Sequence, residues 1–175
     1  MDTVIRVIGL GNVLVGDDAF GPWVIHALES LWTFPPGVSL EDLGTPGLDL
    51  LPYLTDTATV ILADTVRADG SAGELRRYDK AQILANPLQP RVSPHDPGLK
   101  DALLSLELEE RGPREVILVG AIPGPARYDV GLSPAVRAAV EPAARLVVAE
   151  LERLGARPQP RERAVLGTPW WDLEV

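Results

Sequence analysis

The stretch that decides the fold runs from Val4 to Pro22 and reads VIRVIGLGNVLVGDDAFGP. An apolar run is followed by a glycine-rich turn and then by the start of a helix pattern. That order predicts the first strand, turn and helix of an open α/β sheet, where a nucleotide phosphate often binds at the helix N-terminus. Here Asp17 and Asp18 occupy that position, so their negative charge favours a cation over an anion.

The glycine spacing also argues against a dinucleotide site. Counted from Gly9, the G-x-G-x-x-G pattern requires its third glycine where this chain has Leu14, and the next glycine comes late, at Gly16. We therefore interpret the turn as a loop that helps to hold a metal ion rather than a pyrophosphate.

The composition of the chain restricts the class of protein. Its 175 residues suit one domain with a substantial core, and a hydrophobic content of 46% favours a folded globule. A net charge of −9 makes nucleic acid and anionic membranes unfavourable partners. Because cysteine is absent, disulfides, thiolate metal sites and a cysteine nucleophile are excluded. The sequence shows no secretion signal and no apolar run near the roughly 20 residues of a membrane span, so we expect a cytoplasmic protein.

Strand and helix patterns alternate along the chain. The alternation predicts a single α/β domain over residues 1–156: a three-layer, doubly wound, mostly parallel twisted sheet of about five strands with helices on both faces. Residues 157–175 are expected to form a proline-rich linker and an apolar tail. Strands are expected at 4–10, 38–43, 58–63, 115–121 and, at an edge, 74–78; helices at 20–32, 48–54, 99–108 and 133–154; a polar loop at 86–97.

Three reactive side chains follow predicted strands or lie in an adjoining loop. Asp18 comes after the first strand, and Asp64 comes directly after the third. Ligands of open α/β sheets bind beyond the carboxyl ends of the strands, so both carboxylates belong to one edge of the sheet. His95, in the loop Ser-Pro-His-Asp-Pro-Gly before a helix, is expected at the same edge. Two carboxylates and an imidazole suit a borderline divalent ion such as zinc or nickel.

Each of these residues also has a structural interpretation. Asp17 is equally consistent with an N-cap, and Asp18 with a first-turn carboxylate that the helix dipole stabilises. Asp64 at the end of a buried strand requires a partner because desolvation of a carboxylate is costly. His95 on its own is also consistent with a solvated loop residue.

Five motifs together resemble the hydrogenase maturation endopeptidases, which process the large subunit of nickel–iron (NiFe) hydrogenases. The resemblance implies a twisted sheet flanked by helices, a monomer, and removal of a short C-terminal peptide from the large-subunit precursor after nickel insertion. The motifs, in order between residues 4 and 155, are GLGNVLVGDDAFG at 9–21, DLGTPG at 42–47, Ala63-Asp64, Ser93-Pro94-His95 and VGAIP at 119–123.

The resemblance also implies roles for individual residues. The family's metal-contacting positions correspond to Asp18, Asp64 and His95, which we expect to be both metal ligands and catalytic groups. Nickel is implied to arrive bound to the cysteines of the substrate, and zinc and cadmium are other divalent ions expected to fit. Peptide cleavage then uses either a metal-activated water or a carboxylate acting as a general base.

The second motif is expected to bind the substrate. Asp42, Gly44, Thr45 and Gly47 are predicted to form a cleft for the extended C-terminal segment of the large subunit. Glycines permit close backbone approach, and Asp42 would orient a basic side chain near the cut. Turn geometry alone is an equally consistent explanation of Asp42.

Two other functions remain open at the level of sequence. One is a chaperone that recognises nickel on the large subunit without proteolysis, because the recognition residues would be the same. The other is a nucleotide-binding α/β protein, favoured by the Gly9-x-Gly11 turn and by Asp42 as a ribose ligand, and disfavoured by Leu14 and the adjacent aspartates.

The tail contains two contrasting parts. Prolines and charges predict that Pro158 to Arg163 has neither helix nor strand. Trp170 and Trp171 are costly to leave in water, at about 25 cal/mol per Å² of apolar surface. We expect one of them to fold back onto its own domain, in preference to docking onto another chain.

Overall fold

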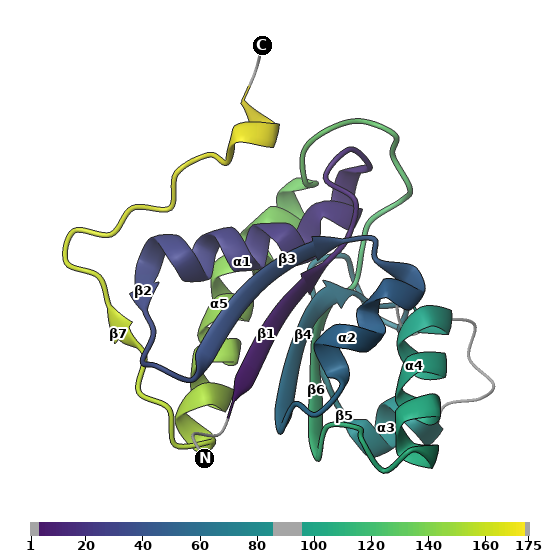
Figure 1. The fold of residues 1–175 in the computed structure, drawn as a ribbon. Coiled ribbons are helices and arrows are strands. Elements are labelled where there is room, and N and C mark those ends of the chain that lie inside the picture. Colours follow the sequence, from purple (N-terminus) through teal and green to yellow (C-terminus); the bar gives the residue numbers. More distant parts are fainter. Residues whose placement is uncertain (1–3, 86–95, 174–175) are drawn as a thin grey trace.

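A five-stranded sheet forms the centre of the computed structural model, which describes residues 4–85 and 96–173 (Figure 1). The strand order is β3-β1-β4-β6-β5. The first four strands are parallel and β5 lies antiparallel at the edge, so the predicted mostly parallel α/β sheet with a polar edge strand is confirmed. The strands are β1 (Ile5–Leu10), β3 (Val38–Gly44), β4 (Thr59–Thr65), β5 (Leu75–Asp79) and β6 (Glu115–Ala121).

Helices cover both faces of the sheet, which gives the predicted three layers. The first face is covered by α1 (Phe20–Leu31) and α5 (Pro134–Arg153). The second face is covered by α2 (Leu51–Leu54), α3 (Lys80–Ala85) and α4 (Asp96–Leu108). Short 3₁₀ helices lie at η1 (Gly16–Ala19), η2 (Gly47–Leu50) and η3 (Trp170–Asp172).

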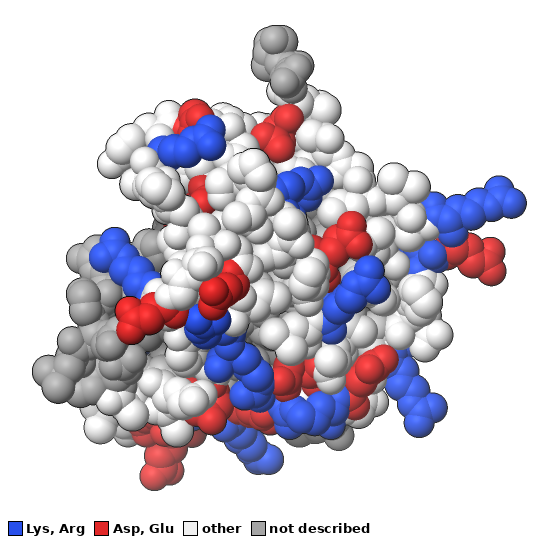
Figure 2. All heavy atoms as spheres, turned by 180° about the vertical axis from the view of Figure 1, so that it is seen from behind, with Lys and Arg blue, Asp and Glu red and all other residues white. Residues whose placement is uncertain are grey.

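Charged side chains lie on the outside of these layers. Figure 2 shows Lys and Arg interspersed with Asp and Glu on the face seen from behind, most densely over its lower half. In the part of the chain that the structure describes, no helix is both long enough and apolar enough to cross a membrane.

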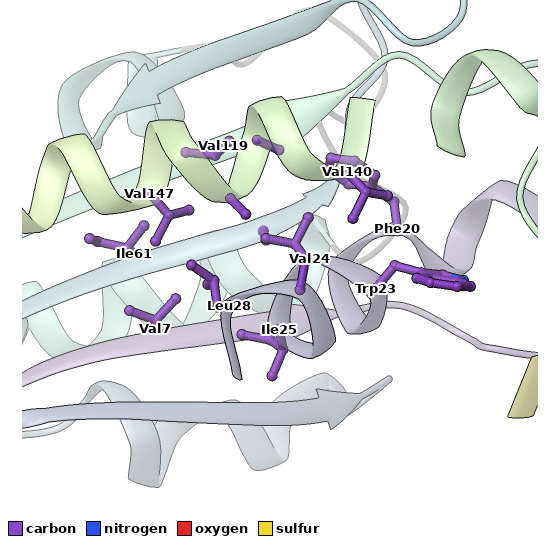
Figure 3. Close-up of a cluster of buried hydrophobic side chains, with 14 of the residues drawn as sticks. Val7, Phe20, Trp23, Val24, Ile25, Leu28, Ile61, Val119, Val140 and Val147 are labelled. Carbon is purple, nitrogen blue, oxygen red and sulfur yellow. The ribbon is translucent and has the colours of Figure 1, made fainter. Parts of the chain in front are cut away.

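Alternate residues of the central strands supply the two halves of the core. Val7, Ile61 and Val119 point toward α1 and α5, where they join Val24 and Val147 (Figure 3). The intervening residues point to the opposite face because side chains alternate along a strand. Burial on both faces explains why these strands appear as continuous apolar runs in the sequence. The second cluster includes Ile8, Leu62 and Leu118.

Glycines allow α1 to begin directly against the carboxyl ends of β1 and β4. A Cβ atom at Gly21 would lie 2.1 Å from the carbonyl oxygen of Leu10 and 2.4 Å from that of Ala63. A Cβ atom at Gly9 would lie 2.6 Å from the carbonyl oxygen of Gly21. β1 has β3 on one side and β4 on the other, so the start of α1 lies where the strand order reverses.

The end of β4 differs slightly from the sequence prediction. Asp64 lies within β4 rather than after it, because Asp64 and Thr65 pair with Gly120 and Ala121 of β6. The predicted loop at 86–97 falls mostly outside the described residues, and its last two residues begin α4.

The prediction that Pro158 to Arg163 contains no strand was wrong. Within it, β7 (Gln159–Pro160) pairs antiparallel with β2 (Trp32–Thr33). A pairing of two residues is too short to produce an alternating pattern, so it could not be recognised from the sequence. The predicted domain boundary at residue 156 stays a prediction.

Candidate active site at the carboxyl end of the sheet

The structure places Asp18 and Asp64 at the same end of the sheet, as predicted. Asp18 lies in η1, which contacts β4, and Asp64 lies near the carboxyl end of β4 itself. Asp64 is fully buried, with 0% of its surface exposed. Its Oδ1 accepts a hydrogen bond of 2.7 Å from the backbone N–H of Thr65. The two carboxylates therefore belong to the edge where ligands of open α/β sheets bind.

The glycine turn after β1 holds Asp18 in place. Gly11 has φ +143°, and a Cβ atom there would lie 1.8 Å from the carbonyl oxygen of Asp18, so only glycine fits. The backbone N–H of Asn12 donates a hydrogen bond of 2.9 Å to Asp18 Oδ2. The side chain of Asn12 accepts one of 3.0 Å from the N–H of Leu14. The turn thus orients a backbone N–H toward the Asp18 carboxylate.

Asp17 has a different role from its neighbour. Its Oδ1 accepts a hydrogen bond of 2.6 Å from the N–H of Ser133, and its Oδ2 accepts from the N–H of Gly124 at 2.8 Å and from the hydroxyl of Ser133 at 2.9 Å. Ser133 directly precedes α5. Interpreting Asp17 as an N-cap of its own helix was therefore wrong. The chain between β6 and α5 passes back over η1, and this long-range contact leaves no local sequence signal.

The third predicted ligand, His95, lies outside the described residues. Among residues 4–85 and 96–173, no three His, Cys, Asp or Glu side chains are grouped so that they could hold a metal ion. The metal triad of Asp18, Asp64 and His95 thus stays a prediction. Carboxylate oxygens are suitable donors for zinc or nickel when nitrogen ligands complete the set.

A groove of about 420 Å³ lies beside the glycine turn whose Asn12 N–H binds Asp18. Three of the four predicted substrate-binding residues, Asp42, Gly44 and Thr45, line it together. Gly47 is the first residue of η2, and its predicted part in the groove stays a prediction. The remaining lining residues are Gly11, Asn12, Val13, Leu43, Trp170 and Trp171.

Asp42 is held by the turn at the end of β3. Its Oδ1 accepts a hydrogen bond of 3.1 Å from the N–H of Gly44, whose φ of +59° is the left-handed conformation that glycine tolerates. The carbonyl of Gly44 in turn accepts a bond of 2.8 Å from the N–H of Gly11. Surrounding protein atoms raise the pKa of the Asp42 carboxyl above its ordinary value through desolvation, and the Gly44 N–H partly opposes that shift.

The sequence did not reveal that the tail reaches this groove. Trp171 packs edge-to-face against Trp23 and His26 of α1, at ring distances of 6.4 and 6.0 Å, which confirms that one tryptophan folds back onto its own domain. Trp170 is 78% exposed. The paired tryptophans were a visible signal, but the surface that they contact is far away in the sequence.

The fold defines an α/β protein with a mostly parallel sheet, and Asp18 and Asp64 lie at the carboxyl end of its strands, where open α/β sheets bind their ligands. The model of the hydrogenase maturation protease family matches residues 22–150. The chain is 35% identical over 162 residues to the hydrogenase 2 maturation protease of Escherichia coli K12, covering 90% of this chain and 96% of that protein. It is 31% identical to the hydrogenase expression/formation protein HupM of Azotobacter chroococcum, covering 90% of this chain and 76% of that one.

Solved structures agree with the sequence relatives. The hydrogenase maturating endopeptidase HybD of E. coli superposes with a TM-score of 0.84 at 34% identity, covering 90% of this chain and 98% of that chain. A hydrogenase 2 maturation peptidase from a Thaumarchaeota archaeon gives a TM-score of 0.64 at 34% identity, with 87% and 98% covered. This chain therefore belongs to the hydrogenase maturation protease family, and it is a peptidase.

Proposed function

We propose that this peptidase removes a short C-terminal peptide from the nickel-loaded large-subunit precursor of a NiFe hydrogenase. The observation that carries the proposal is the fully buried Asp64 at the carboxyl end of β4, next to the 3₁₀ helix that bears Asp18. Burial of a carboxylate costs free energy, so its position at the ligand-binding edge favours a chemical role over a structural one. Membership of the maturation protease family supports the same substrate.

Asp18 and Asp64, with His95, are the residues that would contact the nickel carried by the substrate. A divalent ion polarises a peptide carbonyl and lowers the pKa of bound water. The Asn12 and Thr65 N–H groups orient the two carboxylates before substrate binds. A carboxylate held beside the scissile bond would accept the proton of the attacking water. The chain has no cysteine that could act as a nucleophile instead.

The groove beside β3 would bind the extended segment on which the enzyme acts. Asp42 would attract a basic side chain of that segment. The resulting ion pair would lower the pKa of the Asp42 carboxyl, which desolvation raises in the free protein. The groove reaches Asn12, which holds Asp18, so a peptide in it would approach the proposed metal ligands. The proposed partner is the large-subunit precursor, and the protease would act as a monomer in the cytoplasm.

Intact-mass measurement of the precursor tests this function. Nickel-loaded precursor incubated with the wild-type protein should lose the mass of a short C-terminal peptide. Asp64→Asn should leave the precursor at full length while the variant keeps the circular dichroism spectrum of the wild type. Asp101→Asn makes the same chemical change on an exposed position of α4 and should process normally.

Two results would overturn the proposal. A precursor that binds the wild-type protein but keeps its full mass would indicate a nickel-recognising chaperone. Normal processing by Asp64→Asn would remove Asp64 from the chemistry.

A further inference from the structure

The tail after α5 follows α1 along its length. β7 pairs with β2 just beyond the C-terminal end of α1, and the N–H of Arg161 donates a hydrogen bond of 2.8 Å to the carbonyl of Leu31. Further along, a ring nitrogen of His26 lies 2.9 Å from the carbonyl oxygen of Gly167. The tail therefore runs from the C-terminal end of α1 toward its N-terminal end, which is the end that lies on the carboxyl edge of the sheet.

Trp171 fixes the end of this path. Its ring packs edge-to-face against Trp23, which is 1% exposed, and against His26. Trp23, His26 and Trp171 thus form one aromatic cluster. The guanidinium of Arg137 from α5 lies 3.7 Å from the centre of the Trp23 ring. Gly131 of the segment before α5 also approaches the tail, since a Cβ atom there would lie 3.1 Å from Asp172 Oδ1. Trp171 is thus an anchor that holds η3 on the body of the protein.

Trp170 is the member of the pair that faces away from this anchor. Its ring lies 5.8 Å from that of Trp171, and 78% of its surface is exposed. Both tryptophans line the groove that Asp42, Gly44 and Asn12 also line. An exposed indole on a rigid support beside such a groove is the kind of side chain that dominates binding interfaces.

The other lining of the groove suits an extended peptide. The last residues of β3, Asp42 to Gly44, line the groove. β3 is the outermost strand of the sheet on that side, so its outer edge presents backbone N–H and C=O groups there. Asp42 adds a carboxylate, and an indole face attracts both apolar and cationic side chains. The groove thus offers backbone pairing, negative charge and an aromatic surface to one occupant.

We propose that Trp170 is a substrate-binding residue that closes the groove at the carboxyl end of β3 over the extended C-terminal segment of the hydrogenase precursor. The proposal rests on the proposed function for the identity of the occupant. Trp171 is a positioning residue in it, because it acts by holding Trp170. The tail then forms one wall of the binding groove as well as packing on its own domain.

Steady-state kinetics with the nickel-loaded precursor test the role of Trp170. Trp170→Ala should raise KM about tenfold, a typical effect of an aromatic anchor, with kcat changed less than twofold and Tm unchanged. Trp170→Phe keeps an aromatic face and should stay near the wild-type KM. Leu108→Ala is the matched control, because Leu108 is 89% exposed at the end of α4, away from the groove.

A binding measurement separates this proposal from the proposed function. The probe is a synthetic peptide with the C-terminal sequence of the precursor, titrated while tryptophan emission is recorded. The emission change should be present in the wild type and clearly smaller in Trp170→Phe, in which Trp171 still lines the groove, whether or not the peptide is cleaved. An unchanged KM for Trp170→Ala in an active enzyme would overturn the role of Trp170 and leave the proposed function intact. An unchanged KM together with loss of a dimer in size-exclusion chromatography would assign Trp170 to self-association instead.

Discussion

The two ends of the central sheet use their carboxylates in different ways. At the amino end of the parallel strands, carboxylates face arginine or lysine. Asp56 and Arg111, in the loops before β4 and β6, form an ion pair of 2.6 Å. Arg153 at the end of α5 contacts Glu115 at the start of β6, and it pairs with Glu150 at 2.7 Å. Opposite charges are therefore matched locally at this end.

At the carboxyl end, aspartates accept hydrogen bonds from the backbone. Asp17, Asp18, Asp42 and Asp64 each accept at least one bond from a backbone N–H. A backbone N–H orients a carboxylate and stabilises its charge, but it adds no opposite unit charge as an arginine does. Carboxylates oriented in this way attract a metal cation or a basic peptide. The comparison explains why this end is suited to a ligand site and the other to stability.

Replacing Asp18 should have the largest effect, and its neighbour Asp17 provides the contrast. Asp18→Asn should lower turnover by on the order of 1,000-fold, the scale of a lost catalytic group, with Tm nearly unchanged. Asp17→Asn should instead lower the free energy of unfolding by about 2 kcal/mol, because it weakens the bonds to Ser133 and Gly124. Precursor mass and thermal melting measure the two effects. If Asp17→Asn were stable but inactive, Asp17 would have the role in turnover that is assigned here to Asp18.

The close contact between α1 and the sheet predicts the next largest effect, which is a loss of folding stability. Gly21→Ala would place a methyl group 2.1 Å from the carbonyl oxygen of Leu10, so we expect it to destabilise the fold. The expected loss is about 3 kcal/mol, the upper part of the range for overpacked sites. Gly167→Ala is the control, because a Cβ atom there meets nothing within 4 Å. Urea denaturation should separate them clearly, and equal stability of the two variants would show that α1 can move away from the strands.

The ion pairs at the amino end predict a smaller, pH-dependent effect. The hydrogen bond from Arg77 holds the pKa of Glu150 below its ordinary value, against the opposing effect of burial, and Arg153 adds to the lowering. Glu150→Gln should therefore cost about 2 kcal/mol at pH 7. The wild type gains this stability fully above the unfolded-state pKa of about 4.3 and loses it as pH falls through the lower native pKa.

Denaturation at pH 7 and at pH 3 checks this sign. The difference in free energy of unfolding between the wild type and Glu150→Gln should be smaller at pH 3 than at pH 7. Glu152→Gln, at an exposed position of the same helix, should match the wild type at both pH values. A stability difference that grows toward low pH would contradict the lowered pKa of Glu150.

Much of the fold was predictable because its central strands are buried on both faces. The predicted strand at 115–121 coincides with β6, and the first helix begins at Phe20 as expected. The 3₁₀ helix at Gly16–Ala19 was not predicted, because it depends on the segment before α5 that binds Asp17. The two-residue pairing of β2 with β7 was missed because it carries no periodic pattern.

The candidate site was predictable to a different degree for each residue. Asp18 and Asp64 were placed correctly at one end of the sheet, since parallel strands fix where their carboxyl ends lie. Asp42, Gly44 and Thr45 line a common groove, and Gly47 begins the next helix. The contribution of Trp170 to that groove was not predictable, because it depends on the path of the tail along α1.

The sequence by itself determined the layered α/β sheet, the glycine turn after the first strand and the edge at which the aspartates lie. These features depend on local spacing: alternation along strands, helical periodicity, and glycines where no side chain fits. Only the tertiary structure decided that Asp17 binds the start of α5 while Asp18 turns toward the glycine loop, and that the tail lines a groove at the end of β3. Such contacts join residues far apart in the chain, and their energy depends on packing geometry that no local pattern encodes.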